Sequence, residues 1–242
     1  MSLTPYFEDQ AVNVQKLCEG CEKCNQRSEL FQVLSEDEPK IINKDRYSVR
    51  FRPGEVILKQ GTHATSFISI IEGFAKMYIE GHHDRNLVLD FVMPWKLVGS
   101  PGIHLTKKYM YTVVAIQETL VCFLNGNQFN QVMALNSRFA ELYIRMCSGN
   151  YGRSLERMVS LAQKQMHGRI ADALIYLSED IFGQNRVDSA ISRQDLADYT
   201  AMSKDSAIRI LKEFERDNIV GLEGGTIEIL DPDRLHSISM NG

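Results

Sequence analysis

The chain has 242 residues, of which 44% are hydrophobic and 24% are charged, and its formal net charge is −4. This composition is typical of a soluble globular protein, and the length favours two domains over one. No apolar run is long enough to cross a bilayer, and the N-terminus lacks the basic and apolar regions of a signal peptide. We therefore expect a cytoplasmic protein with no membrane partner. The acidic balance argues weakly against nucleic-acid binding, because a local basic face can serve on an acidic molecule.

Residues 1–28 are expected to form a leader that contains three of the five cysteines. Cys18, Cys21 and Cys24 lie in the stretch CEGCEKC, with two residues between each and the next. An odd cysteine count in a cytosolic chain argues against a disulfide framework. Three thiols at this spacing can bind zinc, hold part of an iron–sulfur cluster or bind no metal, and the spacing alone leaves these alternatives open.

Residues 29–127 are expected to form a β-roll domain. Between residues 47 and 123, short apolar or alternating runs are separated by turn signals at Pro53, Gly54, Gly61, Gly73, Gly81, Pro101 and Gly102. Turns at these intervals are typical of an antiparallel roll or barrel. The sequence therefore predicts that this domain is all-β.

Residues 128–163 show helical spacing and predict one long helix. Six residues recur at alternating steps of three and four, namely Ile144, Cys147, Tyr151, Ser154, Met158 and Leu161. This is the spacing of a two-stranded coiled coil, so we predict that the helix forms a homodimer interface. A second stripe of Phe139, Leu142 and Met146 can pack on the β-domain. The alternative is a monomer whose helix packs only on its own β-domain. Residues 163–168 are expected to form a hinge.

Residues 164–242 contain a helix-turn-helix pattern. A first amphipathic helix is predicted from Ile170, Ala173, Leu174, Leu177 and Ile181. Ser192 with Asp195 forms a capping box that begins a short helix, and Ser203 with Ser206 begins a second helix after a turn at 201–202.

The second of these helices has an apolar face and a polar face. Ala207, Ile210, Leu211 and Phe214 are expected to face inward, and Lys204, Asp205, Ile208, Arg209 and Lys212 lie on the opposite face. After this helix, apolar residues alternate on either side of a Gly-Gly turn, which predicts a hairpin. Charged helical faces are often only solvated, but this ordered set of caps, turn and hairpin is typical of a winged DNA-binding domain.

These elements resemble those of the CRP/FNR family of bacterial transcription regulators. The resemblance rests on RPGE (52–55), QG (60–61), GFAK (73–76), LVG (97–99), SRQDLA (192–197) and SKDSAIRIL (203–211). It implies an α+β fold with an N-terminal antiparallel β-roll, jelly-roll-like or cupin-like and of the cyclic-nucleotide-binding-domain type. A long dimerisation helix and a C-terminal winged helix-turn-helix follow. The implied function is a homodimeric regulator that senses an effector and binds an inverted-repeat site in double-stranded DNA, with RNA polymerase as a further partner.

The resemblance also assigns roles in the helix-turn-helix. The reading helix of the family has an acidic residue and an arginine four positions apart, which match Asp205 and Arg209, and Lys204 matches a basic position that reads an additional guanine. An arginine can bind guanine O6 and N7 as a fork. The helix N-termini would hold phosphates through Ser192, Arg193, Gln194, Ser203 and Ser206. Ile208 replaces the small or hydroxyl residue common in the family, and Ala201 replaces the usual turn glycine.

The sequence also bears on which effector the β-roll would bind. Members that bind cyclic nucleotides carry an arginine-containing triplet for the phosphate, and Tyr109, Met110 and Tyr111 stand at that place here. A buried cyclic phosphate would lack its counter-charge, which disfavours cyclic AMP. The three residues can line a pocket for a small apolar ligand or belong to the core of the roll. His82 and His83 suggest haem or metal, although polar residues at a hairpin tip are usually solvated.

In the oxygen-sensing branch of the family, three N-terminal cysteines and one in a strand of the roll hold a [4Fe-4S] cluster. By this resemblance Cys18, Cys21, Cys24 and Cys122 are the candidate ligands, although the gap before the third cysteine is longer in that branch. Zinc binding, thiol redox chemistry and the absence of any metal are the alternatives. In the last case Cys122, like Cys147, would be a small apolar core residue.

Two other functional classes are open to test. The β-roll also occurs as a regulatory module, so the chain could be a partner-binding protein that does not read DNA. An enzyme is not expected, because the sequence contains no glycine-rich phosphate loop and no nucleophile motif.

Overall fold

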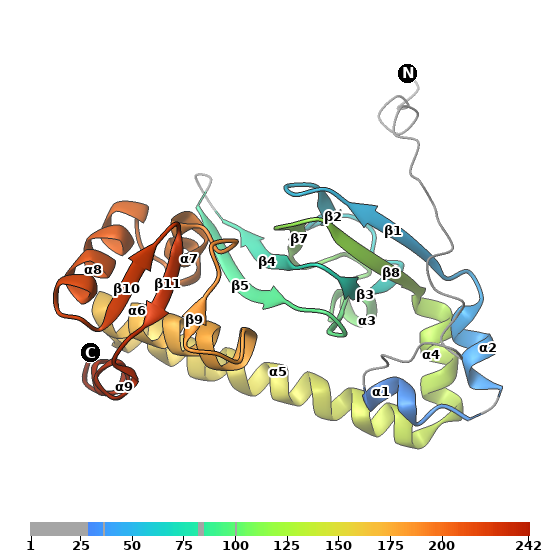
Figure 1. Cartoon of the computed structure of the whole chain (residues 1–242). Coiled ribbons are helices and arrows are strands. Elements are labelled where there is room, and N and C mark those ends of the chain that lie inside the picture. The colour runs from blue at the N-terminus through green and yellow to red at the C-terminus, as the bar shows by residue number, and fades with distance from the viewer. Residues whose placement is uncertain (1–28, 36, 82–84, 100) are drawn as a thin grey trace.

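The computed structural model describes residues 29–35, 37–81, 85–99 and 101–242. Cys18, Cys21 and Cys24 lie outside the described residues, and so do His82 and His83. A β-roll, a long helix and a small winged domain follow one another along the chain (Figure 1). This arrangement confirms the fold class that the sequence predicts.

The roll consists of two four-stranded antiparallel sheets. Its strands are β1 (Tyr47–Phe51), β2 (Val56–Leu58), β3 (Ser66–Glu72), β4 (Ala75–Glu80), β5 (Asn86–Val92), β6 (Leu97–Val98), β7 (Thr112–Ala115) and β8 (Thr119–Asn125). One sheet has the order β1-β8-β3-β6 and the other β2-β7-β4-β5. The apolar side chains of both sheets alternate into one shared core, which explains why the short runs of the sequence form strands.

Helices pack at one end of the roll and beneath it (Figure 1). They are α1 (Glu29–Gln32), α2 (Glu38–Asn43), α4 (Gly126–Leu135) and α5 (Ser137–Gln163), and a short α3 (Gly102–Leu105) lies in the connection after β6. The fully buried ring of Phe67 on β3 stacks on Phe129 of α4 at 4.1 Å between centroids and meets the edge of Tyr143 of α5. These ring contacts fix α4 and the start of α5 on the roll.

The predicted single helix from residue 128 is wrong in one respect, because the structure has two helices with a break at Asn136. Asn136 has an extended backbone with ψ 101°, and its side-chain oxygen accepts a hydrogen bond from the backbone N–H of Phe139. Its side-chain nitrogen donates to the carbonyl of Val33 at 3.0 Å. The asparagine therefore caps α5 and ties it to the segment after α1, a role that helical periodicity does not reveal.

The helix α5 runs along the molecule from the roll to the winged domain and has two apolar faces (Figure 1). Phe139 is fully buried, and Leu142 and Met146 pack against the core of the roll, as predicted. The other face is exposed. Its large apolar residues are Ile144, Tyr151, Leu155, Met158 and Val159. One helix therefore has one face packed on its own chain and one apolar face in solvent.

The C-terminal domain is a winged helix-turn-helix. It contains α6 (Met166–Ile175), the π-helical turn η2 (Tyr176–Ile181), β9 (Arg186–Val187), α7 (Arg193–Tyr199), α8 (Lys204–Arg216), β10 (Val220–Glu223), β11 (Thr226–Ile229) and α9 (Pro232–Asn241). The predicted capping box of Ser192 and Asp195 is confirmed, and Ser203 caps α8. The turn between α7 and α8 places Ala201 at φ 50°, a left-handed conformation that costs an alanine about 1 kcal/mol.

The predicted hinge is a break of two residues between α5 and α6. Lys164 and Gln165 have extended backbones with ψ 148° and 169°. Asp172 of α6 accepts hydrogen bonds from Lys164 at 2.8 Å and from Ser160 of α5 at 2.5 Å. It also accepts one from Ser239 of α9, so the connection is bound to both helices that flank it and to the C-terminal helix.

The guanidinium of Arg157 joins β5 of the roll to α7 of the winged domain. This side chain of α5 donates to the carbonyls of Leu89 and Tyr199 at 2.7 Å each, and also to the carbonyl of Val88. Its guanidinium lies 4.1 Å from the centroid of the Tyr199 ring. Burial lowers the pKa of Arg157, and the three carbonyls and the ring compensate part of this loss of solvation.

Two further polar contacts surround Arg157. Tyr176 of η2 donates to Asp90 of β5, and this carboxylate also pairs with Lys96 at 2.5 Å. Burial raises the pKa of the Tyr176 hydroxyl, so the tyrosine stays protonated and acts as the donor. Lys76 of β4 pairs with Asp195, the capping residue of α7. We call the contacts of Arg157, Tyr176 and Lys76 the domain junction.

We expect Arg157→Leu to lower the free energy of unfolding by about 2–4 kcal/mol, because three carbonyls lose a charged donor. The matched control is Arg153→Leu, one turn earlier on α5, where the arginine is exposed and bonds only to Asn150 in the described structure. The control should change stability by less than about 0.5 kcal/mol. Urea unfolding followed by circular dichroism measures both variants, and equal losses would contradict the central role of Arg157.

Candidate nucleic-acid interface

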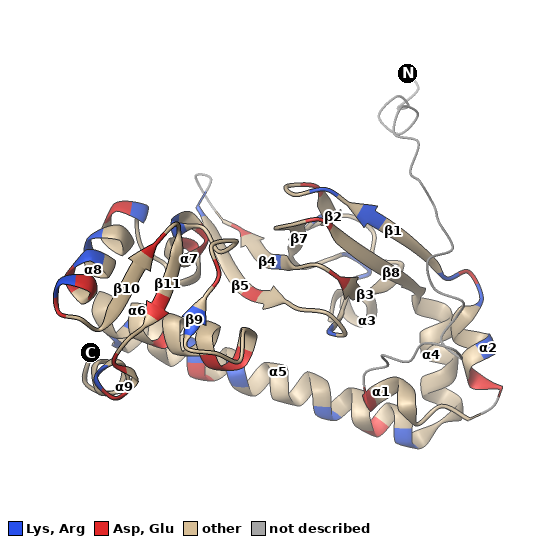
Figure 2. Cartoon of the chain, viewed as in Figure 1, with Lys and Arg blue, Asp and Glu red and all other residues tan. Residues whose placement is uncertain are grey.

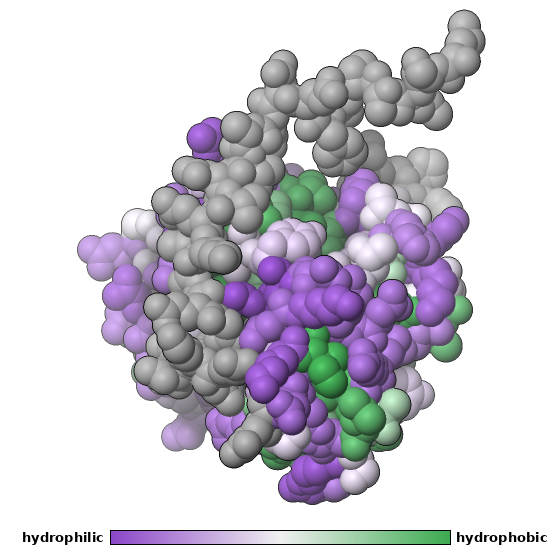
Figure 3. Space-filling model, turned by 90° about the vertical axis from the view of Figure 1, so that its right-hand side faces the viewer, coloured by the Kyte–Doolittle hydropathy of each residue, from purple (hydrophilic) through white to green (hydrophobic). Residues whose placement is uncertain are grey.

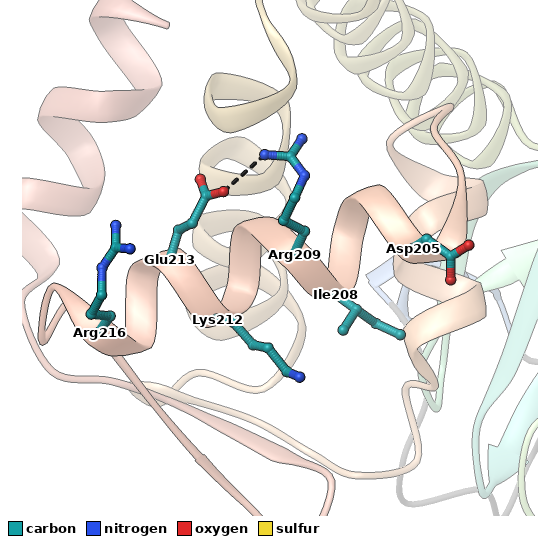
Figure 4. Close-up of a pocket in the computed structure, with 6 residues that line it drawn as sticks. All are labelled: Asp205, Ile208, Arg209, Lys212, Glu213 and Arg216. Carbon is teal, nitrogen blue, oxygen red and sulfur yellow. Dashed lines mark hydrogen bonds and ion pairs between the residues drawn. The ribbon is translucent and has the colours of Figure 1, made fainter.

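The outer face of α8 is a charged surface on the winged domain. The apolar face of the helix is buried, with Ala207, Ile210, Leu211 and Phe214 each at most 3% exposed, as predicted. Basic and acidic residues occur together along α8 (Figure 2). They line a shallow groove formed by Asp205, Ile208, Arg209, Lys212, Glu213 and Arg216 (Figure 4). The structure therefore brings three of the predicted DNA-contact residues, Asp205, Ile208 and Arg209, into one groove.

Arg209 is held within this groove by a residue that the sequence analysis did not include. Its Nη1 donates to Oε1 of Glu213 at 2.8 Å, one helical turn further along α8. The other carboxylate oxygen of Glu213 lies 2.7 Å from Nε2 of His167, near the start of α6. These two partners hold the pKa of Glu213 below its usual value, so the carboxylate is ionised.

Asp205, which the sequence analysis pairs with Arg209, is exposed and points away from the arginine (Figure 4). Asp205 and Glu213 are each four residues from Arg209 in the sequence, so either carboxylate lies one helical turn from the arginine and could pair with it. Ile208 is half-buried between them, and Lys204 is exposed at the first position of α8. The sequence signal for Glu213 was therefore available, but only the structure distinguishes the two carboxylates.

The predicted phosphate-contact residues lie at the N-termini of α7 and α8. Ser192 is occupied in its capping box, where its hydroxyl donates to Asp195 at 2.6 Å. Arg193 is half-buried, and this burial lowers its pKa, while Gln194 is exposed and donates to Asp198. On α8, Ser203 donates to Ser206 at 2.9 Å. These side chains flank backbone N–H groups that a helix N-terminus leaves available to anions.

Hydrophobic residues form a hairpin beyond α8 that has the geometry of a wing. β10 and β11 pair in antiparallel register, with Leu222 opposite Ile227. Gly224 and Gly225 have φ values of 55° and 91°, which a two-residue hairpin turn of this kind requires. The predicted Gly-Gly turn is therefore confirmed.

Cys122 lies on β8, directly opposite Ser48 of β1 and Ser69 of β3. It is 7% exposed, and its sulfur lies 3.5 Å from Nη1 of Arg46. The strand β8 packs against α2 and α4. Within the described ranges, no group of three or more His, Cys, Asp or Glu side chains is arranged to hold a metal ion. The other three candidate ligands lie outside those ranges.

The surface at this end of the molecule is mainly hydrophilic. Figure 3 views the end that α1, α2 and α4 occupy in Figure 1, and it shows small hydrophobic patches among polar side chains.

The proposed effector residues 109–111 do not act as one unit. Tyr109 is buried and its hydroxyl donates to the carbonyl of Ser66 at 2.8 Å, and buried Tyr111 accepts from the backbone N–H of Gly99 at 3.0 Å. Met110 between them is 45% exposed. Burial raises the pKa of both tyrosine hydroxyls, which therefore remain neutral. Their rings form part of the core of the roll.

The chain matches two family models. The first, described as a cyclic nucleotide-binding domain, covers residues 48–136, and the second, a Crp-like helix-turn-helix domain, covers residues 168–238. Among curated proteins, the nitrogen fixation regulation protein FixK of Bradyrhizobium diazoefficiens is 25% identical over 199 residues, which are 79% of this chain and 81% of that protein. The transcriptional activator protein Anr of Pseudomonas protegens is 23% identical over 202 residues, or 81% and 82% of the two chains.

Solved structures show the same fold. The structure of FixK2 from Bradyrhizobium japonicum superposes with a TM-score of 0.74 at 19% identity and covers 80% of this chain and 96% of that one. A CRP/FNR-family structure from Eubacterium rectale has a TM-score of 0.72 at 18% identity and covers 88% and 98% of the two chains.

The chain belongs to the CRP/FNR family of transcription regulators. It is a regulator with a helix-turn-helix DNA-binding domain, and proteins of this family bind DNA as dimers. Its relatives are transcription regulators and not enzymes. In the parts of the chain that the structure covers, no helix combines the length and the apolar character needed to cross a membrane.

Proposed function

We propose that this chain forms a homodimer whose β-roll receives a signal and repositions two winged domains on an inverted-repeat DNA site. The observation that supports this most directly is the outer face of α8, where Arg209 and Lys212 line an exposed groove while the apolar face is buried. We assign residues 1–28 to a leader, 29–127 to the roll, 128–163 to the dimerisation segment and 164–242 to the DNA-binding domain. RNA polymerase is the further partner that the family resemblance implies.

In this proposal α8 enters the major groove of DNA. Arg209 binds a guanine as a fork, Lys204 reads an additional guanine, and Asp205 accepts from a cytosine. Ile208 contacts the methyl group of a thymine. The polar residues at the starts of α7 and α8, namely Ser192, Arg193, Gln194, Ser203 and Ser206, bind phosphates and set the register.

The exposed apolar face of α5 is the proposed dimer interface. Ile144 and Tyr151 are 60% and 65% exposed, an unusual state for large apolar side chains on one helix face. Cys147, Ser154 and Leu161 belong to the predicted seam as well. Leu155 and Val159, which lie outside that predicted set, extend the exposed face toward the winged domain. A second copy of the helix would bury this surface in a two-fold arrangement.

The domain junction offers a route from the roll to DNA. Arg157 belongs to the dimerisation helix and contacts both β5 of the roll and Tyr199 of α7. A signal that shifts the roll against α5 therefore also shifts the carbonyls that Arg157 binds. The junction is a physical connection whose two arrangements would place the paired winged domains differently on DNA.

For the signal, we propose Cys18, Cys21, Cys24 and Cys122 as ligands of a [4Fe-4S] cluster. Four thiolates are the ligand set that such a cluster requires, and the Arg46 guanidinium beside Cys122 favours a negatively charged sulfur. The cluster, when bound, would supply a redox-reactive group. Zinc, thiol redox chemistry, haem and a small apolar ligand near residues 109–111 are the alternatives.

We expect the double variant Ile144→Glu, Met158→Glu to dimerise at least about 100-fold more weakly, because like charges would be buried at a symmetric seam. Sedimentation equilibrium measures this change. The control is Arg145→Glu with Gln163→Glu, two exposed positions about 100° around the helix from Ile144. If both double variants dimerise as tightly as wild type, the seam is assigned to the wrong face.

We expect Arg209→Ala to cost about 1–3 kcal/mol on a duplex selected from a random pool and to relax the preference for one guanine in each half-site. Arg193→Ala should weaken binding to all duplexes alike and reduce the salt dependence. Two-fold symmetry requires half-sites about one helical turn apart. A selected site without inverted symmetry would contradict dimeric reading, and no duplex binding at all would favour a partner-binding protein.

The cysteines are tested on anaerobically purified protein, wild type against Cys122→Ser. A cluster predicts iron, sulfide and visible absorption in the wild type, slow alkylation of Cys18, Cys21 and Cys24, and loss of these properties in the variant. Zinc predicts a colourless protein that contains the metal. A colourless protein without metal, in which these three thiols alkylate freely, would contradict the cluster proposal.

A further inference from the structure

The side chain that reads DNA in the proposed function is restrained by two residues. Arg209 donates to one oxygen of Glu213, and His167 lies at hydrogen-bond distance from the other oxygen. The three side chains come from α8 and α6, which pack against each other in the winged domain. The His167 ring also packs 6.0 Å from the ring of Phe214, whose side chain is buried. The carboxylate of Glu213 therefore has a defined position, because both of its oxygens are bound.

A restrained arginine differs in its physical properties from a free one. A long arginine side chain loses about 2 kcal/mol of rotamer entropy when it is ordered, and a prior hydrogen bond removes part of that loss from binding. The guanidinium has five N–H donors, of which Glu213 uses one, so the others are available to bind O6 and N7 of guanine. The side chain of Arg209 is 54% exposed and its free donors can reach a base.

We infer that Glu213 is a positioning residue that sets the orientation of Arg209 and thereby its specificity for guanine. This inference rests on the proposed function, in which Arg209 reads a base. Glu213 contacts no base in this proposal. It acts through the arginine, and its carboxylate pairs with the charged guanidinium of Arg209 on one side and lies at hydrogen-bond distance from Nε2 of His167 on the other.

Two observations favour Glu213 over Asp205 in this role. Glu213 is the carboxylate bonded to Arg209, whereas Asp205 points away from it (Figure 4). Glu213 is also the less exposed of these groups, at 30% for its side chain, because it lies between α8 and α6. Since His167 follows the extended residues 164–165, a movement of α6 against α8 changes the position of the carboxylate that holds Arg209.

The test compares Glu213→Gln with Glu215→Gln in the full-length protein. Glu215 is an exposed glutamate on the same helix, so its substitution removes the same charge. Dissociation constants are measured on the selected duplex and on a duplex with the Arg209 guanine replaced. The specificity ratio is the dissociation constant on the replaced duplex divided by that on the selected duplex. We expect Glu213→Gln to reduce this ratio about three- to tenfold, since a weaker acceptor orients the guanidinium of Arg209 less well. Glu215→Gln should raise affinity for both duplexes and leave the ratio unchanged.

His167→Phe provides a second variant that keeps an aromatic ring against Phe214 and removes the partner of Glu213. We expect a smaller reduction of the same ratio. Ratios within twofold of wild type for both Glu213→Gln and His167→Phe would overturn the inference. Arg209→Ala separates this outcome from failure of the proposed function. If Arg209→Ala also leaves the ratio unchanged, Arg209 does not read the guanine. If Arg209→Ala brings the ratio to about one while Glu213→Gln and His167→Phe leave it unchanged, only the role of Glu213 is wrong.

Discussion

The two domains are joined by one half-buried guanidinium and by the apolar and ring contacts beside it. Arg157 of α5 donates to carbonyls in the middle of β5 and at the end of α7, and its guanidinium lies over the ring of Tyr199. A charged group in such a place is stable only when it is hydrogen-bonded. The buried Nε of Arg157 has no partner in the described structure, so the bonds from its two terminal nitrogens hold the carbonyls in place. Because hydrogen bonds need aligned donors and acceptors, the contact of Arg157 also fixes the orientation of the two domains. Apolar packing tolerates small rotations of one domain against the other, but a guanidinium with fixed acceptors does not.

Because Arg157 is part of α5, this helix has three contact surfaces. Its buried face, with Phe139 and Tyr143, packs on the roll, its exposed apolar face is available to a second copy, and Arg157 contacts the winged domain. A displacement of the helix therefore affects packing and domain orientation together, and in the proposed dimer it affects the pairing of the two copies as well. The break at Asn136 contributes to this arrangement, because α4 descends from the end of β8 and α5 then runs in another direction, beneath the roll toward the winged domain (Figure 1).

The winged domain combines local order with a charged groove. Capping by Ser192 and Ser203 begins α7 and α8 at defined residues, and the left-handed Ala201 sets the turn between them. The strain at Ala201 is small compared with the apolar burial of α8, so the alanine is tolerated in a position that favours glycine. The arginine of the groove is then oriented by Glu213, and this carboxylate by His167 of another helix.

The sequence by itself determined the elements whose signals are local. Alternating apolar runs with glycine turns predicted the roll, the Ser-x-x-Asp capping box predicted α7, and the Gly-Gly pair predicted the wing, because each signal lies within a few residues of the structure it forms. The tertiary structure decided which distant residues meet. Arg157 is 68 and 42 positions from the carbonyls of Leu89 and Tyr199, and His167 is 46 positions from Glu213. The burial of Tyr109 and Tyr111 and the cap at Asn136 also depend on contacts with other segments. Helical and strand periodicity tells which face of an element is buried, but the partner of that face is set by how the elements pack.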